Sequence, residues 1–171
     1  MPAAPNGYNR GSTLACRAAQ PDKEQLLNPN GTWITDGTIV QFMPNFGIAI
    51  VLTPIPTTIS GSAVNTAISG RPVCLEGDER SVASSGCVYI APPYTTPGVG
   101  TLKIMKLAPD QLSSSSGCEG KKTILKGTMF QAVLEVQTPA TIPGVGVPDP
   151  LPKHVGGTGQ FIPNQFQCGS G

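Results

Sequence analysis

The residues best suited to chemistry in this 171-residue chain are five cysteines and a single histidine. The cysteines are Cys16, Cys74, Cys87, Cys118 and Cys168, and the histidine is His154. Thiolate and imidazole groups bind metals or act together as a nucleophile and its base. No two cysteines form a C-x-x-C pair, and their spacing matches no common zinc-finger template. A Cys–His nucleophile would have to use His154, which nothing in the sequence places near a particular thiol.

The carboxylates offer no clearer catalytic pattern. Glu76, Asp78 and Glu79 cluster, but no polar partners accompany them, so we expect turn and solvation roles. The chain has no G-x-S-x-G elbow, no H-E-x-x-H and no P-loop. The Gly-Val-Gly runs at residues 98–100 and 144–146 lack the following helix that a dinucleotide site needs. The sequence therefore predicts that the protein is not an enzyme.

The composition favours a small all-β domain. Glycine and proline number 21 and 18, which argues against long helices, and only 12% of residues are charged. The formal net charge of +1 and the short basic pair at residues 121–122 exclude a nucleic-acid partner. The first 13 residues have no apolar signal-peptide region, and the longest apolar run, residues 47–52, is too short to span a membrane. We expect synthesis in the cytoplasm without a signal peptide.

The turn and strand signals divide the chain into three parts. Residues 1–37 read as an irregular arm with Trp33 as its anchor, residues 38–140 as a β domain, and residues 141–171 as a Pro/Gly-rich C-terminal extension. Strands are expected at residues 38–43, 47–52, 57–60, 66–69, 73–75, 87–90 and 101–107. Residues 108–112 suggest one helical turn, residues 113–120 a loop, and residues 121–125 and 129–136 a hairpin. We expect the tail from Val155 to be ordered only against a partner, and His154 to lie at the surface beside Lys153.

Residues 59–78 carry the most specific pattern in the chain. Gly61 and Ser62 precede a short β-type run, Gly70 and Pro72 follow, and Gly77-Asp78 closes the segment. Such glycines and prolines mark sharp turns between very short strands. At this spacing the segment resembles the repeat of PAAR-type spike-tip proteins, with Leu75 standing where that family has arginine. The match is strong over about 20 residues and weaker over residues 47–140.

The resemblance implies a fold and a place in a larger particle. PAAR proteins form a small cone of short β-hairpins with pseudo-threefold shape. One copy caps a trimeric (VgrG-like) spike protein in a phage tail-like particle, a type VI secretion apparatus or an extracellular injection system. The tip sharpens the spike for puncture of the target envelope, which it meets transiently, and can carry effector cargo. Residues Gly61, Ser62, Gly70, Pro72, Gly77 and Asp78 would then shape the hairpins.

The resemblance also implies a metal near the vertex. PAAR proteins usually hold one metal with several histidines and a cysteine, whereas this chain has only His154, outside the matched segment. Cys87 is the best candidate for a vertex thiol, and Cys74 and Cys118 would complete a thiolate-rich zinc or iron site. The alternative is three separate thiols, buried or free.

Two other function classes stay open on the sequence. The turn-rich, weakly charged composition would also serve another baseplate, fibre or decoration protein of a phage-like particle. Stoichiometric zinc or iron in the purified protein would favour a tip over these. A small hydrolase carried as the tip's cargo is the third class, and turnover abolished by Cys87→Ala would support it.

Overall fold

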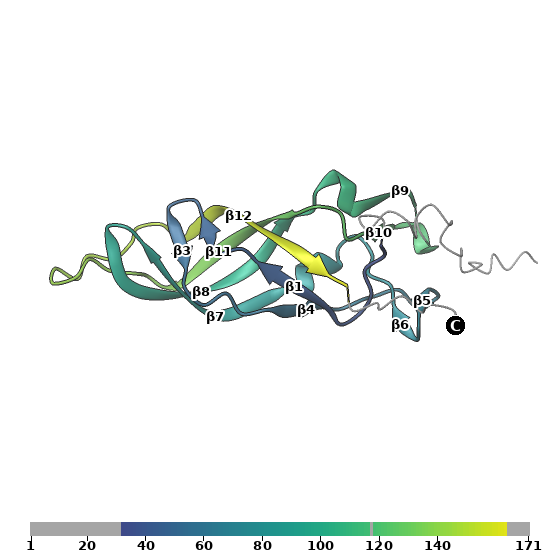
Figure 1. Cartoon of the computed structure of the whole chain (residues 1–171), viewed down its shortest axis with the longest axis horizontal. Coiled ribbons are helices and arrows are strands. Elements are labelled where there is room, and N and C mark those ends of the chain that lie inside the picture. The colour runs from purple at the N-terminus through teal and green to yellow at the C-terminus, as the bar shows by residue number, and fades with distance from the viewer. Residues whose placement is uncertain (1–31, 117, 164–171) are drawn as a thin grey trace, which may run out of the picture.

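A computed structural model describes residues 32–116 and 118–163, with the side chains of residues 115–118 excluded, and these residues form an elongated β body (Figure 1). The predicted all-β class is confirmed. The strands are β1 Thr38–Phe42, β2 Asn45–Phe46, β3 Ala49–Val51, β4 Thr57–Ile59, β5 Ala67–Ile68, β6 Arg71–Pro72, β7 Ala83–Ala91, β8 Tyr94–Lys106, β9 Leu112–Ser116, β10 Lys122–Ile124, β11 Phe130–Thr138 and β12 Lys153–Ile162. Short 3-10 turns lie at η2 Asp78–Ser81, η3 Pro109–Gln111 and η4 Cys118–Gly120. The helical turn expected at residues 108–112 is confirmed by η3.

The main sheet has eight strands in the order β2-β3-β7-β8-β11-β12-β1-β4. All the paired strands are antiparallel. Residues 49–59 begin as β3 beside β7 and end as β4 beside β1. One continuous segment therefore joins strands from opposite parts of the sheet, so the sheet curls back on itself. Two small ribbons, β5-β6 and β9-β10, stand outside it.

The core fills the concave side of this sheet. Alternate residues of β1 point inward, so Val40 and Phe42 are buried while Gln41 is exposed. The rings of Phe42 and Phe161 each pack against Phe130, with centroids 5.7 and 5.1 Å apart.

Strand β12 corrects the expectation for the C-terminal tail. Residues 155–162 lie between β11 and β1 in the main sheet, so the prediction that they are ordered only against a partner is wrong. The inward positions of β12 include Gly157 and Gly159 with Phe161. Glycine hides the apolar alternation by which a buried strand is usually recognised.

The pairing of β10 and β11 differs from the expected hairpin. Strand β10 pairs with β9, whereas β11 pairs with β8 and β12, so the predicted hairpin of residues 121–125 with 129–136 is wrong. Residues 113–120, expected as a loop, contribute most of β9. The backbone N–H of Leu125 donates to the carbonyl oxygen of Gln111, and that of Lys126 donates to the carbonyl oxygen of Thr32. These two hydrogen bonds hold the chain between the β9-β10 ribbon and β11 of the main sheet.

The strand lengths also differ from the expectation. Strands β5 and β6 have only two residues each, but β8 has 13, and the expected strand at residues 87–90 extends over Ala83–Ala91. Ser85 and Gly86 form an irregularity inside β7, where the register shifts between Ser84 and Cys87. Where a strand was expected at residues 73–75, Val73 and Leu75 form isolated bridges to Thr35 and Thr123.

The body has two different ends. The ribbons β5-β6 and β9-β10 lie at one end, which we call the broad end, and β12 runs toward it (Figure 1). The opposite end narrows to the β7–β8 turn and the loop between β11 and β12 (Figure 1). We define the narrow end as residues 86–102 and 136–152.

Candidate functional site at the two ends of the body

The predicted turn residues come together at the broad end around one carboxylate. Oδ2 of Asp78 accepts hydrogen bonds from the backbone N–H of Ser62, at 2.9 Å, and of Leu75, at 2.8 Å. The Gly61-Ser62 segment and the Gly77-Asp78 turn, 16 residues apart in sequence, are thereby joined directly. We call residues 59–78 the turn module.

Glycine is required where the backbones of the turn module approach each other. A Cβ atom on Gly61 would lie 2.6 Å from the carbonyl oxygen of Pro72. The backbone N–H of Gly61 donates to Oδ1 of Asp36 at 3.0 Å, which holds the module against the turn before β1. Gly77 has a φ of 109°, which other residues adopt only with strain. Gly70, with a φ of 77°, turns the chain between β5 and β6.

A small apolar cluster lies beneath this module. Ala63, Val73 and Leu75 are buried together, and Trp33 and Ile68 pack against them. Trp33 also bridges to Leu125. The predicted role of Trp33 as an anchor on the body agrees with these contacts, although its side chain is only partly buried.

Glu119 is a structural residue that the sequence analysis missed. Its Oε1 accepts hydrogen bonds from the backbone N–H of Val64, at 2.9 Å, and of Asn65, at 3.1 Å. This carboxylate ties the β9–β10 ribbon to the turn module across more than 50 residues of sequence. No local pattern could have revealed this pairing, because the two segments meet only in the folded chain.

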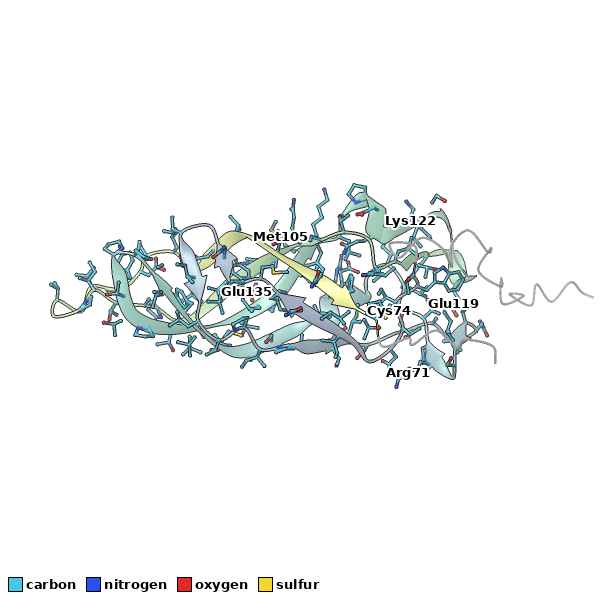
Figure 2. All side chains as sticks on the ribbon, in the orientation of Figure 1. Arg71, Cys74, Met105, Glu119, Lys122 and Glu135 are labelled. Carbon is cyan, nitrogen blue, oxygen red and sulfur yellow. The ribbon has the colours of Figure 1, made fainter. Side chains whose placement is uncertain are left out.

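Charged residues are distributed unequally along the body. Figure 2 shows Arg71, Glu119 and Lys122 at the broad end, with Glu135 nearer the middle. The two segments of the narrow end contain a single formally charged residue, Asp149, which is buried. The same segments contain eight of the chain's 18 prolines, at positions 92, 93, 97, 139, 143, 148, 150 and 152.

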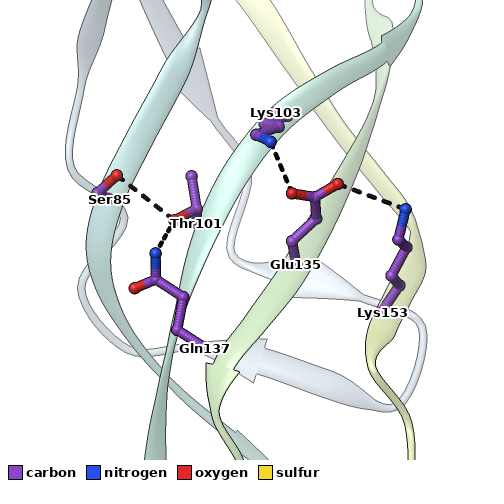
Figure 3. Close-up of polar contacts among 6 residues, drawn as sticks. All are labelled: Ser85, Thr101, Lys103, Glu135, Gln137 and Lys153. Atoms are coloured by element: carbon purple, nitrogen blue, oxygen red, sulfur yellow. Dashed lines mark hydrogen bonds and ion pairs between the residues drawn. The ribbon is translucent and has the colours of Figure 1, made fainter.

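A row of polar side chains marks the inner limit of the narrow end (Figure 3). Glu135 on β11 pairs with Lys103 on β8, at 2.6 Å, and with Lys153 on β12, at 3.4 Å. The hydrogen bond from Lys103, together with both positive charges, lowers the pKa of Glu135. Beside this trio, Thr101 accepts a hydrogen bond from Gln137 at 2.8 Å and lies 3.4 Å from the Ser85 hydroxyl (Figure 3).

A buried polar cluster holds the loop of the narrow end to the sheet. Nε2 of His154 lies 2.7 Å from Oδ2 of Asp149, and both side chains are almost fully buried. The Tyr89 hydroxyl accepts a hydrogen bond from the backbone N–H of Ala140 and lies 3.5 Å from the same carboxylate. Burial is the main cause of a raised Tyr89 pKa. The expectation that His154 is a surface residue is wrong, because its inward position on β12 places it against Asp149.

The described cysteines lie in different surroundings. Cys74 is buried where its backbone bonds to Ile34 and Ile124, and burial raises the pKa of its thiol to about 12. Cys87 is buried on β7, and its Sγ donates to the carbonyl oxygen of Ser84 at 3.5 Å.

No cluster of three or more His, Cys, Asp or Glu side chains suited to a metal occurs among the described residues. The side chain of Cys118 and all of Cys16 and Cys168 lie outside those residues. The proposed site of Cys74, Cys87 and Cys118 for zinc or iron therefore stays a prediction.

The arrangement is a β body with a charged broad end, whose turn module is braced by hydrogen bonds, and a narrow opposite end without exposed charge. Such a body suits a structural role, and the comparison with protein families agrees with that interpretation. The family model described as "Contractile injection system spike tip protein" matches residues 30–170. The chain belongs to this family. The predicted resemblance to spike-tip proteins of contractile injection systems is thus confirmed.

Membership in the spike-tip family makes the protein a structural component of a contractile injection particle, associated with its spike. A search of curated proteins found no match. In the part of the chain that the structure describes, no helix has the length and apolar character needed to cross a membrane.

Proposed function

We propose that this spike-tip protein caps the trimeric central spike as a single copy. The observation that carries the proposal is the family match over residues 30–170, which covers both ends of the body. In this arrangement the broad end is seated on the spike and the narrow end leads. The polarity of the body supports this orientation, because the broad end carries charged side chains such as Arg71, Glu119 and Lys122, whereas the loops of the narrow end expose none.

The turn module gives the proposed seat its rigidity. Asp78 joins its two turns, Asp36 ties it to the segment before β1, and Glu119 ties it to the β9–β10 ribbon. A docking surface whose backbone is held from three directions loses little conformational entropy on binding. Effector cargo, if carried, would attach at the broad end, since the narrow end must meet the target envelope first.

Co-expression with the trimeric spike tests this function. Native mass spectrometry of the purified complex is expected to show one tip protein per spike trimer. Labelling the broad and narrow ends in an assembled particle would then give the orientation. A chain located along the sheath or elsewhere on the baseplate would instead support a fibre, baseplate or decoration role and contradict the proposal.

A further inference from the structure

The narrow end combines three features that suit the interior of a lipid bilayer. It lacks exposed charge, it leaves few backbone donors unpaired, and it exposes aliphatic side chains. We propose that the loop of residues 139–152 is a lipid-contacting surface that enters the apolar region of a phospholipid bilayer without help from anionic headgroups. This inference rests on the proposed function and identifies which residues of the tip meet the membrane.

Charge is the first feature. A charged side chain is costly in the hydrocarbon region unless it is paired or reaches the interface. The one carboxylate of the narrow end, Asp149, is buried against His154, and its other oxygen accepts a hydrogen bond from the backbone N–H of Leu151 at 3.0 Å. Among the described residues, the other ion pairs are those of Glu135 with Lys103 and Lys153, which lie at the inner limit of this end.

The backbone is the second feature. In lipid, each unpaired N–H group costs free energy because no water is present to accept its hydrogen bond. The eight prolines of the narrow end have no N–H group. Thr141 exchanges two backbone hydrogen bonds with Thr96, and the N–H of Ile142 donates to Val147 at 2.9 Å. Further N–H groups that donate within this end are those of Val145, Gly146, Asp149 and Leu151.

Exposed aliphatic side chains are the third feature. Val145, Val147 and Leu151 have 73%, 44% and 43% of their surface exposed. Transfer of such surface from water to hydrocarbon is favourable in proportion to its area. Because this surface carries no net charge, its affinity for vesicles should depend little on anionic lipid or on salt.

The broad end provides a matched control. Val64 is 85% exposed, but its own backbone N–H and that of Asn65 donate hydrogen bonds to the carboxylate of Glu119. The exposed residue type is therefore the same at both ends, and only the surroundings differ. The same substitution at Val145 and at Val64 therefore compares lipid contact at the narrow end with lipid contact at the broad end, because the residue replaced is a valine in both cases.

The experiment uses the full chain with vesicles of phosphatidylcholine, alone or mixed with phosphatidylglycerol. Tryptophan is introduced as Val145→Trp or Val64→Trp, and quenching by brominated lipid reports contact with the acyl chains. We expect additional quenching for Val145→Trp in both lipid mixtures and none for Val64→Trp. In flotation assays, Val145→Lys should lower the vesicle-bound fraction at least about tenfold, and Val64→Lys should change it by less than about twofold.

Equal quenching of the two tryptophan variants, binding that requires phosphatidylglycerol, or no vesicle association at any lipid concentration would overturn the inference. Thermal unfolding of each variant confirms that the exposed substitution leaves the fold intact. Spike binding, measured on the same variants, separates this inference from the proposed function. If Val145→Lys loses spike binding and not vesicle binding, the narrow end is the docking surface and the lipid inference is wrong. If vesicle binding depends on Val145 but no spike complex forms, the proposed function fails and the lipid surface stands.

Discussion

Nε2 of His154 lies 2.7 Å from Oδ2 of Asp149, and both side chains are almost completely buried. The pair joins β12 to the loop that forms the narrow end, and Tyr89 from β7 completes the contact. Three separate parts of the chain are thus held together by polar groups that water does not reach. In such a place, removing one partner leaves the other buried and unsatisfied.

The first prediction concerns this pair. Asp149→Ala should lower the free energy of unfolding by about 3–5 kcal/mol, because it leaves His154 without its buried partner and frees the N–H of Leu151. Urea denaturation measures the loss. Proteolysis should also become faster within residues 139–152.

Lys153→Gln is the matched control for Asp149→Ala. Lys153 neighbours His154 in sequence but is exposed, and its ion pair with Glu135 spans 3.4 Å. We expect a change of less than about 1 kcal/mol for this variant. A loss for Asp149→Ala no larger than that of the control would show that the buried pair does not hold the loop.

The second prediction concerns the carboxylate of the turn module. Asp78→Ala removes the acceptor of the N–H groups of Ser62 and Leu75 and should cost about 2–3 kcal/mol in unfolding free energy. Glu76→Ala, an exposed carboxylate two residues away, should cost less than about 0.5 kcal/mol. Hydrogen exchange at residues 61–75 locates the effect, and unchanged exchange in the Asp78 variant would count against the bracing role.

The third prediction concerns the fit between Gly159 and Phe130. A Cβ atom at position 159 would lie 2.5 Å from the ring of Phe130 and 2.7 Å from the carbonyl oxygen of Gln41. Gly159→Ala should therefore destabilise the protein by about 1–3 kcal/mol through overpacking. In the Phe130→Leu background the same substitution should cost less, and a double-mutant cycle measures the difference. Strictly additive effects would contradict this contact.

The fourth prediction concerns the thiol of Cys74. Its pKa rises from 9.0 to about 12 in the folded chain, with burial as the main cause and the charges of Asp78 and Asp36 adding to it. Since the folded state holds the proton more tightly, the resulting stability is present below about pH 9 and is lost as the pH rises toward 12. Unfolding free energies of the unaltered chain should thus fall more steeply above pH 9 than those of Cys74→Val.

Alkylation gives a second measurement of Cys74. Peptide mapping should find Cys74 unmodified in the native protein at neutral pH and modified after unfolding. Rapid alkylation of Cys74 in the native protein would show that the thiol is not buried. Parallel pH profiles of the unfolding free energy for the two proteins would show that its pKa is not raised. Metal analysis of the same samples tests the predicted zinc or iron site, with Cys118→Ser expected to release any metal held by the three thiols.

The general character of the fold could be read from the sequence, but its pairing could not. Strand β1 shows regular alternation, and Gly70 and Gly77 mark real turns, so those elements were predictable. Strand β12 was not predictable, because Gly157 and Gly159 have no side chains at its inward positions. The rings of Phe46 and Phe130, from other strands, fill the space there. The hydrophobic periodicity of one segment cannot show that side chains of another segment fill the space that its glycines leave.

The candidate site was predictable to a similar extent. The residues of the turn module share one short segment, so their spacing alone indicated that they act together. His154 and Glu119 depend on partners that only the fold brings near, and the sequence assigned neither of them a role. The two nearly uncharged segments were visible in the sequence. That they form one end of the body became clear only from the pairing of β8 with β11.

Cryo-EM of the assembled injection particle can give both the position and the orientation of the protein. We expect one copy at the apex of the trimeric spike, with the ribbons β5-β6 and β9-β10 against the spike and residues 139–152 pointing away from it. Density for the protein elsewhere in the particle, or at the apex with residues 139–152 buried in the spike, would contradict this expectation.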